Sequence, residues 1–584
     1  MLLFETAWRD GFQWYERVYN DVTKQTEVLK IDSKSEYFTT DPNGTWHDFL
    51  NPNITYSPCL GKAADARINA GSCMPVYRHL RDVRTKFNHD ARVWYLDIET
   101  RADVIRVINP AYLNETFYVN EGEKYKGYEL ATMHDDIYRI SRDGINYTRL
   151  SAFASTYDLF LVAEAFPKPA LAQHTITAIQ INDSTQNQII ILCLREFDQA
   201  RLSHYKDLSK VKFCVCRDEL TLIKAFIKIF KHFNPVMVLA WNGDSFDFPY
   251  LYHRFKHYGL EQGLSNYGPV SIEKIKHTKD KYRLTTPGHE FIDFMEVYKK
   301  FTFTPQTSYA LDNIADFELG VGKVEHDEFN SFDSLYTGRL YSITKQPIND
   351  KLREDIRQAK IANSQDFYDL VYLLFIKYAI VDVELLARLD TKLRLSMLML
   401  VIGEKMGVLL SDTLRTVKPW AQYISNQVYS RHMVVPYQGE PDESEIIGGY
   451  VKDPNPGRYR WVLNADVNSM YPRLSITAFN MSPETFISPE KAPPGIKEVI
   501  NLIVSGQDEN RLLNIPDSLK DVLTQALKKH HLCMGVNGAL FDASKVGLVP
   551  ELVTNIYNER KVAKFKMLQT QAKLALINDL LEDK

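Results

Sequence analysis

The chain has 584 residues, which is too long for one compact core and predicts several domains. Its apolar fraction of 45% and charged fraction of 25% are those of a soluble globular protein. The formal net charge of −4 excludes a uniformly basic protein but no class of partner, because a nucleic-acid channel can be locally basic.

Cysteine usage and hydropathy point to a cytoplasmic protein. The six cysteines are scattered and are interpreted as reduced thiols, with Cys214 and Cys216 as same-face strand residues rather than ligands. The N-terminus has no signal-peptide core, and no window reaches 18 apolar residues. We therefore expect no membrane span.

The predicted elements change character along the chain. Residues 1–90 combine aromatic residues with turn signals, which indicates a small, mostly β domain. From Val93, strands alternate with helices, which predicts an α/β sheet with functional residues at strand ends. Residues 101–164 interrupt this pattern as a polar, β-rich insertion.

The second half of the chain begins with helical periodicity over 363–409. A connector rich in proline, glycine and charge follows at 436–460 and is the clearest predicted domain boundary. We expect a strand at 461–466 ending in Asp466, and a long helix from about 551.

Asp97 and Glu99 form a D-x-E pair at the end of the strand over 93–98. Because side chains alternate along a strand, both carboxylates point to one face. Carboxylate pairs chelate divalent ions, although solvated edge residues are the ordinary alternative.

Asp247 lies where the loop after the strand VMVLAW enters a helix. A helix N-cap is the ordinary role for such an aspartate. That role leaves unexplained the turn at Asn242 and Gly243, which directs the same loop at the strand end.

Tyr378 and Asp382 lie one turn apart on one face of an apolar helix. An aspartate there is costly unless it is paired or binds metal, and the Tyr378 hydroxyl is the alternative partner. Converging carboxylates on an α/β sheet can hold two metal ions about 4 Å apart for phosphodiester hydrolysis. Tyr378 would orient the attacking water.

These three motifs together resemble the DEDDy-type 3'-5' proofreading exonuclease of family B DNA polymerases. The segment YKKFTFTPQTSYALDNIADFELGVGK resembles the tailed-phage, T-even-like branch. The resemblance implies an RNase H-like domain and two Mg²⁺ ions per site, with Mn²⁺ as the alternative. It also places a strand-transfer hairpin near 281–294. The implied metal ligands are Asp97, Glu99, Asp247 and Asp382.

The stretch WVLNADVNSMYPRLSI resembles the first polymerase motif of the same family. Asp466 and the carbonyl of Val467 would bind Mg²⁺, and backbone nitrogens near Ser469 and Met470 would cradle a triphosphate. Tyr471 would be the gate that excludes a 2'-hydroxyl. The alternative is an N-capping aspartate followed by a packed tyrosine.

The C-terminal helix carries Arg560 and Lys564 on one face. A solvated basic face is the ordinary interpretation, but the resemblance assigns both residues to the phosphates of the incoming nucleotide, with Lys561 exposed. The connector has Ile446-Ile447-Gly448-Gly449 where the family has Y-x-G-G/A. The sequence contains neither K-x-x-x-N-S-x-Y-G nor D-T-D, so we expect no synthesis by this chain alone.

The sequence therefore predicts the N-terminal part of a replicative DNA-directed DNA polymerase with a complete exonuclease and half of a polymerase site. A stand-alone DEDDy nuclease and a non-catalytic DNA-binding scaffold subunit are the alternatives. Expected partners are primer-template and single-stranded DNA, dNTP, a C-terminal polymerase chain and, through it, a sliding clamp. The expected location is the cytoplasm of an infected bacterial host.

The fold class is α/β multidomain, with an RNase H-like exonuclease, a β-rich N-terminal domain, and a partial α+β palm with its first fingers helix. The predicted domains are a β-rich domain at 1–90, an exonuclease at 91–390 with the insertion at 101–164, a helical connection at 391–437, a partial palm at 438–548 and a fingers helix at 549–584.

Overall fold

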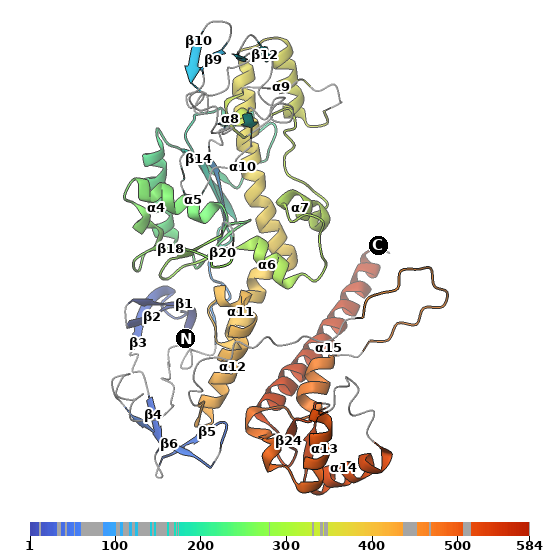
Figure 1. Ribbon diagram of the computed structural model, residues 1–584. Coiled ribbons are helices and arrows are strands. Elements are labelled where there is room, and N and C mark those ends of the chain that lie inside the picture. The colour runs from blue at the N-terminus through green and yellow to red at the C-terminus, as the bar shows by residue number, and fades with distance from the viewer. Residues whose placement is uncertain are drawn as a thin grey trace. The chain divides into compact units, whose positions relative to one another are not determined.

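The structure is a computed structural model (Figure 1). It describes the whole chain except 11–12, 32–36, 41–43, 52, 60–85, 101–105, 109–115, 120–122, 127–139, 143–144, 148–159, 163–168, 171, 173, 279–280, 330–331, 339–340, 342, 344–347, 436–451, 467–468, 506–515, 536 and 583–584. Two compact units are present. Unit 1 comprises Met1–Ser33 and Asp82–Pro419, and unit 2 comprises Lys34–Arg81 and Trp420–Lys584.

Unit 1 is built on a six-stranded mixed sheet. Its strands, in spatial order, are β16 (Val211–Val215), β15 (Gln188–Cys193), β14 (Ile176–Asp183), β7 (Val93–Thr100), β17 (Met237–Ala240) and β20 (Glu290–Asp293). β7, β17 and β20 run parallel, so their carboxyl ends meet at one edge of the sheet. β14 runs antiparallel to β7. The residues of the predicted exonuclease motifs lie at this edge.

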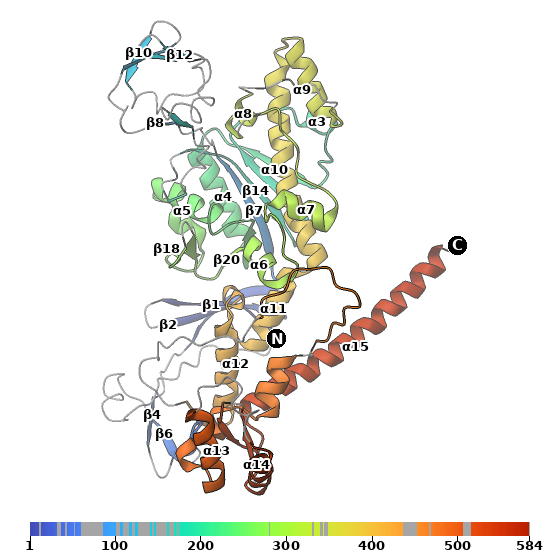
Figure 2. The ribbon, with the colours of Figure 1, turned by 45° about the vertical axis from the view of Figure 1, so that its right-hand side comes forward.

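Helices cover both faces of this sheet (Figures 1 and 2). Helices α4 (Glu219–Phe233) and α5 (Asp247–His257) pack on the face that carries Leu96 and Ile98. The long helix α10 (Asp366–Leu393) covers the opposite face, onto which Tyr95 points. The predicted helical stretch at 363–409 is confirmed as α10 and α11 (Leu395–Met406).

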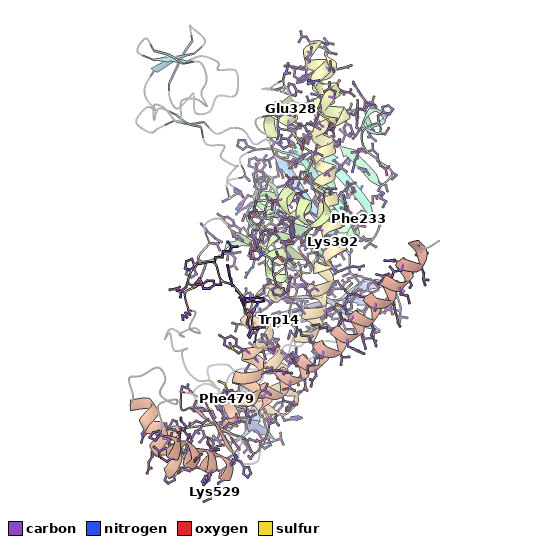
Figure 3. All side chains as sticks on the ribbon, turned by 90° about the vertical axis from the view of Figure 1, so that its right-hand side faces the viewer. Trp14, Phe233, Glu328, Lys392, Phe479 and Lys529 are labelled. Atoms are coloured by element: carbon purple, nitrogen blue, oxygen red, sulfur yellow. The ribbon has the colours of Figure 1, made fainter. Side chains whose placement is uncertain are left out.

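The remaining helices of unit 1 flank these layers. They are α3 (Gln199–Leu202), α6 (Phe294–Phe301), α7 (Leu311–Leu319), α8 (Phe332–Thr337) and α9 (Lys351–Ile361). Helix α12 (Val417–Ser430) begins at the end of this unit. Lys392, at the end of α10 and marked in Figure 3, donates to Glu318 at the end of α7.

Short strands make up the N-terminal part and the insertion. An antiparallel sheet at the N-terminus contains β1 (Leu2–Asp10), β2 (Gln13–Asn20) and β3 (Gln25–Ile31). In the insertion, the described residues form β8 (Arg106–Ile108), β9 (Thr116–Val119), β10 (Glu123–Lys126), β11 (Ile140–Arg142), β12 (Ile145–Tyr147) and β13 (Phe160–Val162). The β content predicted for both regions is thus confirmed for the residues described.

A hairpin that overlaps the predicted segment 281–294 lies beside the main sheet. Strands β18 (Ser271–Lys274) and β19 (Tyr282–Thr285) pair antiparallel across the turn between them. Residues 281–294 therefore supply one hairpin strand, a tight turn and then β20 of the main sheet. The apolar run Phe291-Ile292 favours burial in that sheet, where both residues are almost inaccessible.

The described residues of unit 2 include two small sheets and four α-helices. One sheet orders β21 (Met433–Val434), β5 (Trp46–Asp48), β6 (Thr55–Cys59) and β4 (Tyr37–Thr40); the other orders β22 (Phe486–Ile487), β24 (Leu540–Asp542) and β23 (Leu532–Met534). Its helices are the greater part of α12, together with α13 (Pro494–Ser505), α14 (Asp517–Lys529) and α15 (Leu548–Glu582). α15 is the long C-terminal helix predicted from about 551.

The strand predicted at 461–466 is wrong. Residues 461–466 are exposed and have no strand assignment, and Trp461 has a positive φ of 59°. Trp461 is 99% exposed. No strand pairs with this segment among the described residues, and an extended segment without a partner leaves its backbone groups to water.

Candidate active site in unit 1

Asp97 and Glu99 lie at the carboxyl end of β7, as predicted. Gln180, which faces Asp97 on the neighbouring β14, donates from Nε2 to Asp97 Oδ2 at 2.8 Å and to Glu99 Oε1 at 3.3 Å. Glu99 is 7% exposed and Gln180 is fully buried. The interpretation of this pair as solvated edge residues is therefore wrong.

Asp247 is the first residue of α5 and not its N-cap. The N-cap is Phe246, which makes no side-chain cap hydrogen bond, so the capping alternative is wrong. Asp247 is 2% exposed, and its Oδ1 has no hydrogen-bond partner among the described residues. Burial and then the charge of Asp97 raise the pKa of Asp247 well above its usual value.

The turn before Asp247 explains how the residue is aimed. Asn242 adopts a positive φ of 62°, which asparagine tolerates better than most residues. A Cβ on Gly243 would lie 2.5 Å from Cε2 of Phe248, so only glycine allows the turn to close on the buried Phe248 ring. The Asn242-Gly243 pair therefore brings Asp247 to the sheet edge.

Asp382 and Tyr378 project from α10 toward the same edge. Both are buried, at 2% and 3% exposed respectively. The Tyr378 hydroxyl interacts with Asp382, as the alternative interpretation expects, but it does not satisfy the whole carboxylate. Asp382 Oδ1 has no hydrogen-bond partner among the described residues.

The structure brings three of the predicted carboxylates into one cluster. Ligand-capable oxygens of Asp97, Glu99 and Asp382 all lie within 4.8 Å of one another. Carboxylate oxygens are the donors that hard divalent cations prefer, and buried oxygens without partners have coordination to offer. The cluster therefore fits Mg²⁺ or Mn²⁺.

Lys323 is the member of this site that sequence reasoning missed. Its Nζ donates to Asp382 Oδ2 at 2.5 Å and to the Tyr378 hydroxyl at 2.8 Å. The backbone N–H of Lys323 donates to Asp312 Oδ1 at 2.6 Å, which fixes the loop after α7. Lys323 is the last residue of the segment YKKFTFTPQTSYALDNIADFELGVGK that resembles the phage branch, but its part in the site becomes visible only when the loop is placed beside α10.

The electrostatics of the cluster are those of crowded anions. Burial and then the charge of Asp382 raise the pKa of Asp97 to about 6. Burial and then the charge of Asp97 raise the pKa of Glu99 well above its usual value. Burial lowers the pKa of Lys323, but the Asp382 and Asp97 carboxylates outweigh burial and raise it. The site therefore stabilises positive charge.

The predicted polymerase residues lie in unit 2 and are less enclosed. Asp466 is exposed, and Val467 lies outside the described residues. Ser469 has a positive φ of 55°, and Met470 and Tyr471 are 45% and 62% exposed. The interpretation of Tyr471 as a packed residue is therefore wrong.

The helical turn that follows, Tyr471–Ala478, packs on α15. The guanidinium of Arg473 lies 4.8 Å from the centre of the Tyr557 ring. Arg560, Lys561 and Lys564 on α15 are exposed, as predicted for Lys561. The connector residues Ile446-Ile447-Gly448-Gly449 lie outside the described residues.

The fold and the carboxylate cluster together define a class of protein. A mixed α/β sheet carries buried carboxylates at one strand edge, with a tyrosine and a lysine beside them, which suits metal-assisted chemistry on phosphodiesters. Within the described part of the chain, every helix is too short or too polar to serve as a membrane span.

Comparisons with known proteins agree with this class. Residues 128–314 match "DNA polymerase family B, exonuclease domain", and residues 421–581 match "DNA polymerase family B". The chain belongs to DNA polymerase family B, with an exonuclease domain and part of the polymerase region. The matched ranges contain Asp247, Asp466 and Arg560, whereas Asp97 and Asp382 lie outside them.

The curated relatives include two phage enzymes named DNA-directed DNA polymerase. The one from Escherichia phage RB69 is 25% identical over 462 residues, and the one from Enterobacteria phage T4 is 23% identical over 459 residues. Each alignment covers 75% of this chain and 45% of the relative. A DNA polymerase of Thermococcus gorgonarius is 24% identical over 51% of the chain and 35% of its own length. The chain thus spans less than half the length of these relatives.

Proposed function

We propose that this chain hydrolyses DNA from the 3' end with Mg²⁺ and carries half of a DNA-synthesising site. The observation that carries the exonuclease proposal is the convergence of Asp97, Glu99 and Asp382 beside Tyr378 and Lys323. All of these residues come from unit 1, as does Asp247. Family membership supports DNA as the substrate.

The four carboxylates have the role of metal ligands in this proposal: Asp97, Glu99, Asp247 and Asp382. When bound, two divalent ions supply the charge that activates a water and stabilises the leaving oxygen. The Tyr378 hydroxyl holds the attacking water in line. The ammonium of Lys323 neutralises the Asp382 side of the site and offers a donor to a phosphate oxygen.

The half-site for synthesis consists of residues from unit 2. Asp466 and the Val467 carbonyl hold Mg²⁺, backbone nitrogens near Ser469 and Met470 contact the triphosphate, and Tyr471 excludes a 2'-hydroxyl. Arg560 and Lys564 bind the phosphates of the incoming dNTP. The second metal carboxylate comes from a C-terminal chain or segment, which also carries the sliding-clamp contact.

Exposed apolar side chains on α15 support the proposal that a further chain or segment packs on this helix. Nine of them are at least about half exposed, and large exposed apolar surfaces mark interaction sites. They are Val562, Phe565, Met567, Leu568, Leu574, Leu576, Ile577, Leu580 and Leu581.

A 5'-labelled single-stranded oligonucleotide with Mg²⁺ tests the exonuclease. We expect stepwise shortening from the 3' end by the wild type and none by Asp97→Ala plus Glu99→Ala. Asp369→Ala is the matched control, because Asp369 lies on α10 with Asp382 but is 68% exposed and pairs with Arg195. No shortening by the wild type, or full activity of the double variant, would sink the proposal and favour a scaffold.

Primer extension tests the half-site. The chain is mixed with a polypeptide that carries K-x-x-x-N-S-x-Y-G and D-T-D, and we expect extension that Arg560→Ala abolishes. Degradation without any extension would instead identify a stand-alone nuclease.

A further inference from the structure

The β18–β19 hairpin is attached to the turn that presents Asp247. The backbone N–H of Tyr282, at the start of β19, donates to the carbonyl oxygen of Asp244 at 2.8 Å. Asp244 lies in the turn between β17 and α5, three residues before Asp247. Strand β19 packs beside β20 and α5, so the hairpin lies next to the main sheet (Figures 1 and 2).

Lys281, the residue before Tyr282, makes a second attachment. Its Nζ donates to Glu296 Oε1 on α6 at 2.7 Å, and both side chains are about one-third exposed or less, at 28% and 34%. Its carbonyl oxygen accepts from the N–H of Ile275 at 2.9 Å and so closes the hairpin. Lys281 therefore joins the hairpin to α6 at the point where β19 meets the turn.

The charge of Lys281 also acts on the carboxyl groups of Asp244 and Asp293. Burial and then the charge of Asp293 raise the pKa of Asp244 to about 7, and Lys281 opposes this rise. Lys281 likewise opposes the effect of burial on Asp293, which is 1% exposed and caps α6 through the N–H groups of Met295 and Glu296. The Lys281 ammonium thus pairs with Glu296 on α6 and acts through its charge on Asp244 in the turn and on Asp293 at the end of β20.

We propose that Lys281 is a positioning residue that fixes the hairpin and α6 to the turn carrying Asp247, so that the hairpin sets the position of this carboxylate. The inference rests on the proposed exonuclease, for which Asp247 is a metal ligand. A hairpin that moves would then alter hydrolysis directly, in addition to any contact it makes with DNA.

Hydrogen exchange on the full chain without metal or DNA tests the attachment. In Lys281→Met we expect faster exchange of the amides of Ser245 and Phe246, which donate to the Asn242 carbonyl at 3.0 and 3.1 Å. Lys276→Met is the matched control, because it removes the same charge from the exposed turn of the same hairpin. Lys281→Arg should restore slow exchange.

A second variant keeps the test independent of the hairpin's own folding. Glu296→Gln removes the partner of Lys281 from α6, so it should give the same faster exchange, and the double variant should add nothing. In hydrolysis, Lys281→Met should raise the half-saturating Mn²⁺ concentration about tenfold while leaving kcat at saturating Mn²⁺ within about twofold, because the residue acts through a ligand.

The outcomes separate this inference from the exonuclease itself. Exchange and Mn²⁺ dependence of Lys281→Met equal to those of Lys276→Met, in an active enzyme, would overturn the inference. A chain that shows the exchange difference but never shortens DNA would refute the proposed function and keep the attachment.

Discussion

Replacing Lys323 by methionine should destabilise unit 1 in the absence of divalent metal. The change keeps an unbranched side chain but removes the ammonium that contacts Asp382 at 2.5 Å and Tyr378 at 2.8 Å. Breaking a buried ion pair costs about 3 to 5 kcal/mol. Because Lys323 is 25% exposed and the crowded carboxylates can take up protons, we expect the lower value, about 3 kcal/mol at pH 8.

The cost should shrink as the pH falls. Asp97 has a folded-state pKa of about 6, above the ordinary 3.8, so repulsion within the cluster is present above pH 6 and is relieved as the carboxyl is protonated below it. Mg²⁺ should reduce the cost at pH 8 for the same electrostatic reason.

Guanidinium unfolding in EDTA measures this cost. The transition of unit 1 is first identified, without EDTA, as the one that added Mg²⁺ shifts, because ligand binding stabilises only the unit that holds the site. Lys392→Met is the control, since Lys392 is 49% exposed and its pair with Glu318 should contribute at most about 1 kcal/mol. A deficit no larger than that of the control, or one that grows toward pH 5, would refute the reasoning.

Three further predictions concern other parts of unit 1. His289, buried at 4% exposed, has its pKa lowered to about 3 by burial and then by Arg17, so the folded protein should lose about 3 kcal/mol between pH 7 and pH 4.5. A pH titration of unfolding should show this loss in the wild type and not in His289→Gln. Gly243→Ala should cost about 1 to 3 kcal/mol and reduce hydrolysis, because the new Cβ meets Phe248, whereas Gly495→Ala, with open space around it, should not. Tyr378→Phe should lower kcat roughly tenfold to a hundredfold with an unchanged half-saturating Mg²⁺ concentration, since the hydroxyl orients and does not ligate; a shift in Mg²⁺ dependence instead would show that Tyr378 supports the ligands.

Local patterns were sufficient for the framework of the site. Strand alternation places Asp97 and Glu99 on one face of β7, and helical spacing places Tyr378 and Asp382 on one face of α10. Both patterns depend only on neighbouring residues, so one sequence reveals them. The roles assigned to these residues, and the domain limits, stay predictions.

Tertiary packing decided what the sequence could not. Lys323 reaches the cluster from a loop 59 residues before Asp382, and Gln180 reaches it through pairing of β14 with β7. Neither residue was assigned to the site from the sequence, because each owes its position to a distant partner. Asp247 is the opposite case, because its local sequence suggests a helix N-cap but the N-cap of α5 is Phe246. Phe291 and Ile292 join the main sheet as part of β20, and the assignment of a strand-transfer hairpin near 281–294 stays a prediction.

The two sets of candidate residues differ in what holds them in place. Asp97 and Asp382 belong to a buried strand and a buried helix of one unit, and burying such charges is unfavourable unless a cation compensates them. Lys323 supplies part of that compensation, so the cluster is pre-arranged for further positive charge before any ion binds. Asp466 and Tyr471 are exposed to solvent. The Asp466 carboxylate therefore has no burial penalty for a bound cation to relieve, and these residues alone should not bind an ion tightly. If the proposal is correct, divalent metal should therefore stabilise unit 1 of this chain and leave unit 2 unaffected until the missing carboxylate is supplied.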